Sequence, residues 1–279
     1  MSSIWLVACL LLGMSTIAAQ AQLKLLPVPE LQQVFGGGFR TITLTWHNPG
    51  QKPFSQELST RLYQASSATI VPLGTAPWRS LEILPGQTVI ESASLVFPAV
   101  NAETRFVIHW LAGTNQVLGT SEALVYPPSL LKELKSLAGE EPLGVLDPQN
   151  LLKSLLKAAA VEFLDFEDAN IENYPGKLVI VGPFQNKTQM REGLASQLRA
   201  VAKKGAGVVW LLPPPERKEG RRENLRPSFY AVPEGKGTVV VVQASLTASL
   251  SERPEAQLNL IQFARLALQP ETPRLPDLP

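Results

Sequence analysis

The stretch GKLVIVGPF, residues 176–184, decides how the second half of this chain folds. Its centre is a continuous apolar run without polar alternation, which is typical of a strand that is buried on both faces. Residues 187–204 follow, and from Met190 to Val201 they repeat apolar side chains at helical spacing, so we expect a helix that packs on the sheet. The stretch therefore predicts a sheet covered by helices on both sides.

The same rhythm extends in both directions from this stretch. After Pro127-Pro128 a short helix is expected over residues 130–137, and then strands alternate with helices, the pattern of a parallel α/β sheet. Strands are expected at residues 143–147, 161–166, 177–183, 207–212 and 237–243, and helices at residues 150–160, 187–204 and 254–268.

Three segments together carry a resemblance to a known family. GKLVIVGPF, then KKGAGVVWLLPPP, and later KGTVVVVQASL before a final helix resemble the class I glutamine amidotransferase-like fold, a flavodoxin-like α/β layer, over residues 140–268. The resemblance implies a cysteine on a tight elbow after the strand at 207–212, served by a histidine and a carboxylate. Here that elbow falls at residues 211–214, which are leucine and proline, and no cysteine or histidine follows His109. We therefore expect no catalytic residue and no cofactor-binding residue of that chemistry.

In a doubly wound sheet, ligands bind at the carboxyl ends of the strands where the strand order reverses. With flavodoxin-like order, that crevice lies between Asp147 and Gly182. These side chains are polar or apolar rather than reactive, so they suit binding better than catalysis. The candidate ligand crevice is lined by Asp147, Pro148, Gln149, Pro183, Phe184 and Gln185.

Two charged segments remain in this half. The acidic stretch within residues 162–172 is a candidate site for a divalent cation or a catalytic carboxylate pair. Its spacing matches no calcium loop, so we favour a solvated strand end. The mixed-charge insertion at residues 216–223 is interpreted as a surface loop, or alternatively as a docking loop for a partner. Ser245 has no histidine in its domain to activate it. The acidic stretch consists of Glu162, Asp165, Glu167, Asp168 and Glu172.

The first half has short, often alternating apolar runs separated by turn residues. In the clearest strand, residues 41–46, Ile42, Leu44 and Trp46 share one face. Further strands are expected at residues 88–96, 105–111 and 117–126, about seven in all. Residues 22–127 thus resemble an immunoglobulin or fibronectin type III sandwich, in which Leu44, Trp46, Ile108 and Trp110 would replace the missing disulfide as core.

Few side chains in the sandwich suggest chemistry. His47 and His109 are the only histidines, and neither has a second ligand nearby, so we expect no metal site. Trp78 is a candidate sugar-stacking platform, although an aromatic that packs on the sandwich edge is the favoured interpretation.

An apolar run from Ile4 to Gly13, followed by Ala19-Gln20-Ala21, is typical of a signal peptide over residues 1–21. We expect export, to the periplasm or outside the cell, and loss of Cys9, the only cysteine. A retained membrane anchor and lipidation of Cys9 are the alternatives. With cleavage, no stable membrane span is expected.

Composition limits the partners. Lys and Arg number 25 against 24 Asp and Glu, a formal charge of +1 without long blocks of one sign, which argues against nucleic acid as a partner. The expected organisation is a signal peptide (1–21), an immunoglobulin-like β-sandwich (22–127), a linker helix (128–139), an amidotransferase-like α/β domain (140–268) and a disordered proline-rich tail (269–279).

The leading hypothesis is an exported, non-catalytic interaction or scaffold protein whose partner is another envelope protein. One alternative is an envelope- or carbohydrate-directed enzyme, or an enzyme subunit, that uses carboxylates such as Asp147, Asp165 or Glu167. Another is a sugar-binding module that uses the sandwich. No cofactor and no metal are expected in any of the three.

Overall fold

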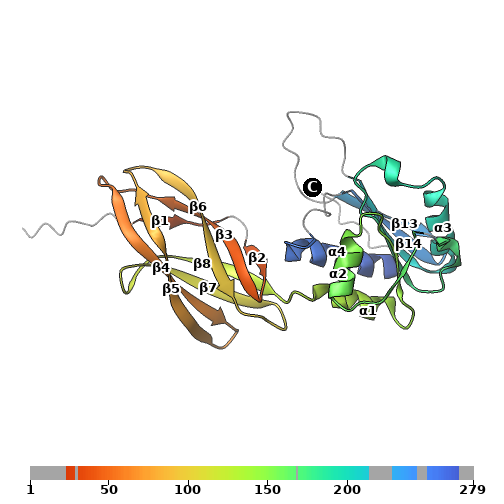
Figure 1. The fold of residues 1–279 in the computed structure, drawn as a ribbon, viewed down its shortest axis with the longest axis horizontal. Helices are drawn as coiled ribbons and strands as arrows, with labels where there is room; N and C mark the ends of the chain where they lie inside the picture. Colours follow the sequence, from red (N-terminus) through yellow and green to blue (C-terminus); the bar gives the residue numbers. More distant parts are fainter. Residues whose placement is uncertain (1–22, 29–30, 168, 214–227, 244–249, 270–279) are drawn as a thin grey trace, which may run out of the picture.

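The structure is a computed structural model that describes residues 23–28, 31–167, 169–213, 228–243 and 250–269. The described chain is mostly β, with a pair of sheets in its first half and one sheet with helices in its second half (Figure 1). The expected signal peptide with Cys9, the insertion at 216–223, Ser245 and nearly all of the expected proline-rich tail lie outside the described residues.

The first half contains two sheets that pack face to face. The smaller sheet has the order β1-β3-β6, with β1 (Lys24–Leu26), β3 (Gly38–His47) and β6 (Thr88–Phe97). The larger sheet has the order β2-β8-β7-β4-β5, with β2 (Gln32–Phe35), β8 (Gln116–Tyr126), β7 (Thr104–Ala112), β4 (Phe54–Ala65) and β5 (Ile70–Ile83). Neighbouring strands are antiparallel, except that β2 runs parallel to β8.

A cluster of tryptophans lies between these two sheets. Leu44, Trp46, Ile108 and Trp110 are at most 1% exposed, which confirms them as core residues. The rings of Trp46 and Trp110 meet edge to face at 6.1 Å, an arrangement that suits the aromatic quadrupole. Apolar packing thus holds the two sheets together, as expected for residues 22–127, which contain no cysteine.

The second half is built on a six-stranded sheet of order β10-β9-β11-β12-β14-β13. Five strands are parallel, whereas β13 pairs antiparallel with β14 at one edge. The strands are β9 (Leu143–Leu146), β10 (Phe163–Asp165), β11 (Leu178–Val181), β12 (Gly207–Leu212), β13 (Ser228–Glu234) and β14 (Gly237–Gln243).

Helices cover both faces of this sheet. They are η1 (Leu130–Lys132), α1 (Glu133–Ala138), α2 (Leu151–Ala158), η2 (Ile171–Asn173), η3 (Lys187–Gln189), α3 (Leu194–Lys204) and α4 (Pro254–Leu268). Leu178 and Ile180 of β11 join the core under α1, α2 and α4, while Val179 and Val181 join the core under α3. The prediction from GKLVIVGPF, a strand buried on both faces, is therefore confirmed.

Two expectations for this half need correction. The helix expected over 187–204 begins only at Leu194, because Gly193 adopts a left-handed backbone (φ +73°) that interrupts the helix, and Met190 packs on the core from the preceding loop. Strand β13 was not predicted, and it makes the sheet mixed rather than all parallel.

Among the described residues, no helix combines the length and apolar character needed to cross a membrane. The apolar run from Ile4 to Gly13 lies outside the described residues.

Gly144 in β9 offers a test of how tightly the sheet packs. A Cβ at this position would lie 2.5 Å from Cε2 of Phe166 and 3.2 Å from Val179, and the Phe166 ring is itself held edge to face against Tyr174. Gly144→Ala should lower the free energy of unfolding by about 1–3 kcal/mol, measured by urea denaturation. Gly38→Ala is the control, because its Cβ would meet only the Arg40 side chain at 3.7 Å and should change stability little. Equal stability of both variants would contradict the packing.

Candidate functional site

The reversal of strand order lies between β9, which is followed by Asp147, and β11, which is followed by Gly182 and Pro183. From β9 the chain first adds β10 on one side of β9 and then adds β11 on the other side, so the order in which strands are added reverses at β9. The backbone N–H of Gly182 donates to the carbonyl of Leu146 at 2.8 Å, which fixes the two strand ends side by side. This is the position that the sequence indicates for a ligand.

The predicted crevice residues divide into two groups. Pro183 and Phe184 are buried, and Phe184 belongs to the core under α3, so they fill the space at the strand ends rather than line an opening. Gln149 is half-buried and Gln185 is exposed, and the side chain of Gln189 joins them. Its Oε1 accepts from the backbone N–H of Gln185 at 2.7 Å and from Nε2 of Gln149 at 3.3 Å. Sequence reasoning missed Gln189, which links the two loops.

Asp147 is fully buried, and its carboxylate is bound by the backbone that leads into α2. Oδ1 accepts from the N–H of Gln149 at 3.2 Å, and Oδ2 accepts from the N–H of Lys153 at 3.0 Å. A carboxylate at this place satisfies amide groups that a helix leaves unpaired at its N-terminus. Burial raises the pKa of Asp147, and the backbone hydrogen bonds from Lys153, Leu152 and Gln149 offset this only in part. The geometry makes Asp147 a helix-capping group.

Lys153 of α2 is the central charge of the site. Its side chain is 4% exposed, and its ammonium Nζ donates to Oδ2 of Asp165 at 2.9 Å and to Oε1 of Glu167 at 2.8 Å. Burial lowers the pKa of Lys153, but the hydrogen bonds to Glu167 and Asp165 outweigh burial and leave that pKa raised. Burial likewise raises the pKa of Asp165, and the hydrogen bonds from Lys153 and from the N–H of Glu167 leave it lowered. Both partners are thus held in their charged forms.

This arrangement changes the interpretation of the acidic stretch. Asp165 and Glu167 are partly exposed, as expected for a strand end, but they converge on a buried lysine rather than only on solvent. Neither Glu162 nor Glu172 forms a side-chain ion pair within the described residues, although Nζ of Lys204 donates to the backbone carbonyl of Glu172 at 2.6 Å. Asp168 lies outside the described residues. No group of three or more His, Cys, Asp or Glu side chains in the described ranges is arranged to hold a metal ion.

At the expected elbow after β12, Leu211 and Pro213 are buried and Leu212 is half-buried, while Pro214 is outside the described residues. None of these three described side chains is a nucleophile, and Pro213 has no backbone N–H to donate.

Arg191, in the loop between η3 and α3, is a site residue that sequence reasoning also missed. Nε and Nη2 of this half-buried side chain are themselves buried and have no hydrogen-bond partner among the described residues. Two N–H groups on one guanidinium match the paired oxygens of a carboxylate or phosphate. Because α3 begins at Leu194 without a side-chain cap, Arg191 adds positive charge near the positive end of a helix.

The candidate side chains of the sandwich have local partners. Nδ1 of His47 lies 3.0 Å from Oγ1 of Thr88, and the His109 ring packs on Tyr63 with centroids 4.7 Å apart. Trp78 is half-buried against Trp46 and Trp110, with the guanidinium carbon of Arg79 5.1 Å from its ring centroid. Trp78 therefore packs on the core edge instead of lying flat and open.

No family model matches this sequence, and no curated protein matches it. Solved structures with partial likeness include the alkylpurine DNA glycosylase AlkC of Pseudomonas fluorescens, bound to DNA containing an abasic site analogue, at 13% identity and TM-score 0.29, covering 38% of this chain and 31% of that chain. A β-glucosidase from Listeria innocua matches at 11% identity and TM-score 0.26 over 38% of this chain and 16% of that chain. A GH3 β-glucosidase of Bifidobacterium adolescentis matches at 9% identity and TM-score 0.26, over 38% and 17%. The match thus spans less than a third of each of these proteins, and scores this low carry no argument about function.

Removing the buried cation tests its structural role. Lys153→Met keeps the apolar stem and should lower the free energy of unfolding at neutral pH by about 1–2 kcal/mol, a value reduced by the exposure of both carboxylates. The lowered pKa of Asp165 gives stability that is lost as pH falls below about 4, and the raised pKa of Lys153 gives stability that is lost as pH rises above about 10. Urea denaturation at a series of pH values should therefore show the largest difference in free energy of unfolding between the natural protein and Lys153→Met within these two limits. Lys203→Met, at an exposed position of α3, is the control. A loss that does not vary with pH would contradict the ion pair.

The two aspartates should respond to pH with opposite signs. Because burial raises the folded pKa of Asp147, its favourable contribution is present below pH 3.8 and is lost as pH rises through the folded value. Asp147→Asn should therefore gain stability relative to the natural protein as pH rises from about 3 to about 7, whereas Asp165→Asn should lose it. Urea denaturation at a series of pH values measures both slopes, and slopes of equal sign would contradict these environments.

Proposed function

We propose that this protein is an exported, non-catalytic interaction protein. In this proposal, an immunoglobulin-like sandwich precedes a degenerate flavodoxin-like domain of the amidotransferase-like kind, and the partner is another envelope protein.

The strand orders support the two fold assignments within the proposal. Without the antiparallel edge strand β13, the α/β sheet has its second strand in chain order outermost, then the first, third, fourth and fifth. That order is the flavodoxin-like one. In the first half, two mainly antiparallel sheets share one apolar core, which supports the immunoglobulin-like assignment.

The non-catalytic proposal rests on the charged groups at the carboxyl edge of the sheet, which are hydrogen-bonded within the protein. Asp147 is bound by backbone N–H groups, and Lys153 is bound by Asp165 and Glu167. A general acid or base needs a proton that it can exchange with a substrate, and a nucleophile needs a neighbouring base. Here the Asp147 carboxylate is instead hydrogen-bonded to backbone N–H groups at the start of α2, and the Lys153 ammonium to Asp165 and Glu167. These internal hydrogen bonds support a binding role over the carboxylate-enzyme alternative.

Arg191 is the residue through which we expect the α/β domain to contact its partner. Its buried, unpaired guanidinium edge lies in the loop between β11 and α3, at the same carboxyl edge of the sheet. Nε and Nη2 are inaccessible in the structure, so an acidic group of another molecule pairs with them only when the loop between η3 and α3 shifts, and that pairing offsets the cost of a buried charge without a partner. The partner therefore presents a carboxylate or another oxyanion to this edge.

A capture experiment with matched arginine variants tests the proposal. The protein without residues 1–21 serves as bait for native envelope extract, beside Arg191→Gln and the control Arg199→Gln, whose exposed guanidinium pairs with Glu234. We expect one reproducible envelope protein to bind the natural bait and the control, with roughly fivefold or greater loss for Arg191→Gln, since charged hydrogen bonds of this kind are worth about 1.5–3 kcal/mol.

Two results together would reverse the proposal. They are the absence of any captured envelope protein that depends on Arg191, and substrate turnover that is lost in Asp147→Ala. Lys153→Met should be assayed in parallel, with circular dichroism of each variant, so that loss of folding is not mistaken for loss of chemistry.

A further inference from the structure

The outward face of the smaller sheet carries a band of uncharged side chains along β3 and β6. Side chains alternate along a strand, so the residues between the buried Ile42, Leu44 and Trp46 point away from the core. The register of β3 with β6 places outward residues of the two strands opposite one another. We call this band the uncharged face. Its cross-strand pairs are Phe39 with Val96, Thr41 with Ser94, Thr43 with Ser92, and Thr45 with Ile90.

Apolar side chains lie at both ends of the uncharged face, and hydroxyl groups lie between them. Phe39 is 72% exposed and Val96 is 54% exposed at one end, and Ile90 is 73% exposed at the other. Leu26 of β1 lies opposite Thr45 and extends the second end. Exposed apolar side chains that gather on one face mark an interaction site, whereas scattered ones do not.

The charged residues of the same two strands belong to the other side of the sheet. Arg40 in β3 and Glu91 in β6 occupy inner positions by strand alternation. Nε of Arg40 donates to the carbonyl of Phe35 at 2.8 Å, and Glu91 forms an ion pair with Arg79 of β5. Neither charge therefore reaches the uncharged face, although 18% of the chain is charged.

The outward face of the larger sheet is different, because it carries charges that are paired. Nε of Arg105 donates to Oε2 of Glu122 at 2.9 Å. Nη2 of Arg61 donates to Oδ1 of Asn115 at 3.1 Å. Paired charges are ordinary for a face that stays in water, whereas depletion of charge is typical of the centre of a protein interface. Of the two outward faces of the sandwich, the uncharged face is the one suited to contact with protein.

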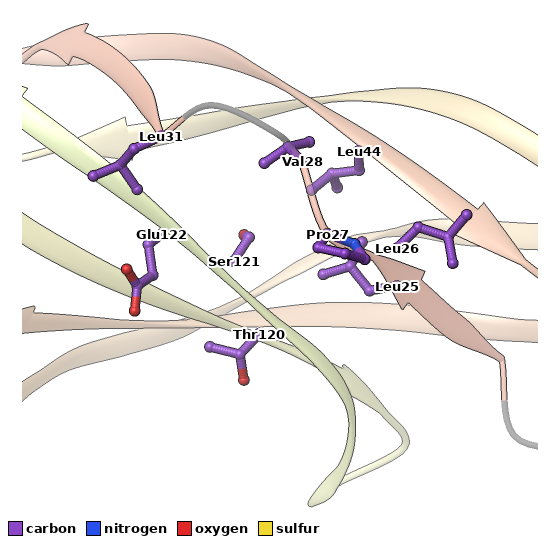
Figure 2. A pocket seen from close by; sticks show the side chains of 9 residues that line it. All are labelled: Leu25, Leu26, Pro27, Val28, Leu31, Leu44, Thr120, Ser121 and Glu122. Atoms are coloured by element: carbon purple, nitrogen blue, oxygen red, sulfur yellow. The ribbon is translucent and has the colours of Figure 1, made fainter.

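The pocket beside β1 does not belong to the uncharged face (Figure 2). It is lined by Leu25 and Leu44 from the smaller sheet and by Ser121 from the larger, so it lies between the two sheets. Leu44 is buried toward the core, and the pocket and the uncharged face are therefore on opposite sides of β3.

The chemistry of the uncharged face is complementary to itself. A hydroxyl group both donates and accepts hydrogen bonds, so a row of threonines and serines can pair with an identical row. Ile42 lies opposite Ala93 at the middle of the face. A two-fold axis that passes over this pair, perpendicular to the strands, brings Val96 of each copy onto Ile90 of the other. Apolar groups then meet apolar groups, and hydroxyl groups meet hydroxyl groups.

The size of the sheet limits how strong such a contact can be. Three strands at their usual spacing and the ten residues of β3 give a footprint of roughly 14 by 34 Å, or on the order of 1,000 Å² for two copies. This area is close to the lower limit for a specific interface, so the contact should be weak, with Kd on the order of 10–100 µM.

We propose that the protein forms a two-fold dimer through the uncharged face of the smaller sheet. The two copies stack sheet on sheet, with hydroxyl rows in the centre and apolar side chains at both ends. This surface is separate from the edge of the α/β sheet that carries Arg191, so this proposal and the proposed function can fail independently.

Sedimentation equilibrium of the protein without residues 1–21 tests the dimer at concentrations from about 1 to about 500 µM. We expect the weight-average mass to rise from the monomer value toward twice that value. The rise should change little between about 50 and 500 mM NaCl, because the interface contains no ion pairs. A monomer at all of these concentrations would overturn the proposal and leave the uncharged face to a different molecule.

Matched glutamate variants locate the interface. Thr43→Glu places a carboxylate beside the two-fold axis, where it meets the same charge of the second copy, and should weaken dimerisation roughly tenfold or more. Thr120→Glu is the control, because Thr120 is exposed opposite His109 on the outward face of the larger sheet. It should dimerise like the natural protein. Equal loss in the two variants, or no loss in Thr43→Glu, would contradict this interface.

Opposite charges at the axis test the two-fold arrangement itself. Thr43→Lys alone should weaken dimerisation as Thr43→Glu does, whereas an equimolar mixture of the two variants should associate again as a mixed dimer. Circular dichroism confirms that each variant is folded. Failure of the folded variants to associate when mixed would show that the residues at position 43 do not meet across a two-fold axis, and would overturn the arrangement.

Discussion

The buried ammonium of Lys153 is the constraint around which the carboxyl edge of the α/β sheet is arranged. A cation with 4% exposure must find anionic partners, because a lone buried charge costs several kcal/mol. Asp165 and Glu167 supply them from the end of β10, and the backbone N–H of the same lysine holds Asp147 at the end of β9. One residue of α2 thereby fixes two strand ends and the start of a helix.

Not every buried polar group at this edge of the sheet is bound within the described chain. The carboxylates that suggest acid–base chemistry are bound internally, whereas the buried Nε and Nη2 of Arg191 have no acceptor among the described residues. The sandwich shows a related effect, because the passage from β1 to β2 leaves a gap that core residues do not fill.

The sequence predicts the strands buried on both faces well, because GKLVIVGPF and the run at 207–212 have no polar side that could face water. The core role of Trp46 and Trp110 follows equally from alternation. The sequence predicts the start of α3 too early, because the apolar spacing from Met190 does not reveal the left-handed backbone at Gly193. Lys153 meets Asp165 and Glu167 across 12 and 14 residues, a contact set by strand pairing and by helix rotation, neither of which spacing alone shows.

Competitive acetylation of the folded protein, analysed by mass spectrometry, tests the central claim that these charges belong to the fold. Lys157, exposed on the same helix, provides the internal reference. If Lys153 is a charged, hydrogen-bonded structural group, its ammonium should react far more slowly than that of Lys157 and should reach the same rate only after unfolding. If Lys153 reacts as fast as Lys157 or faster, it is an accessible, deprotonated nucleophile, and the non-catalytic account of this site is wrong.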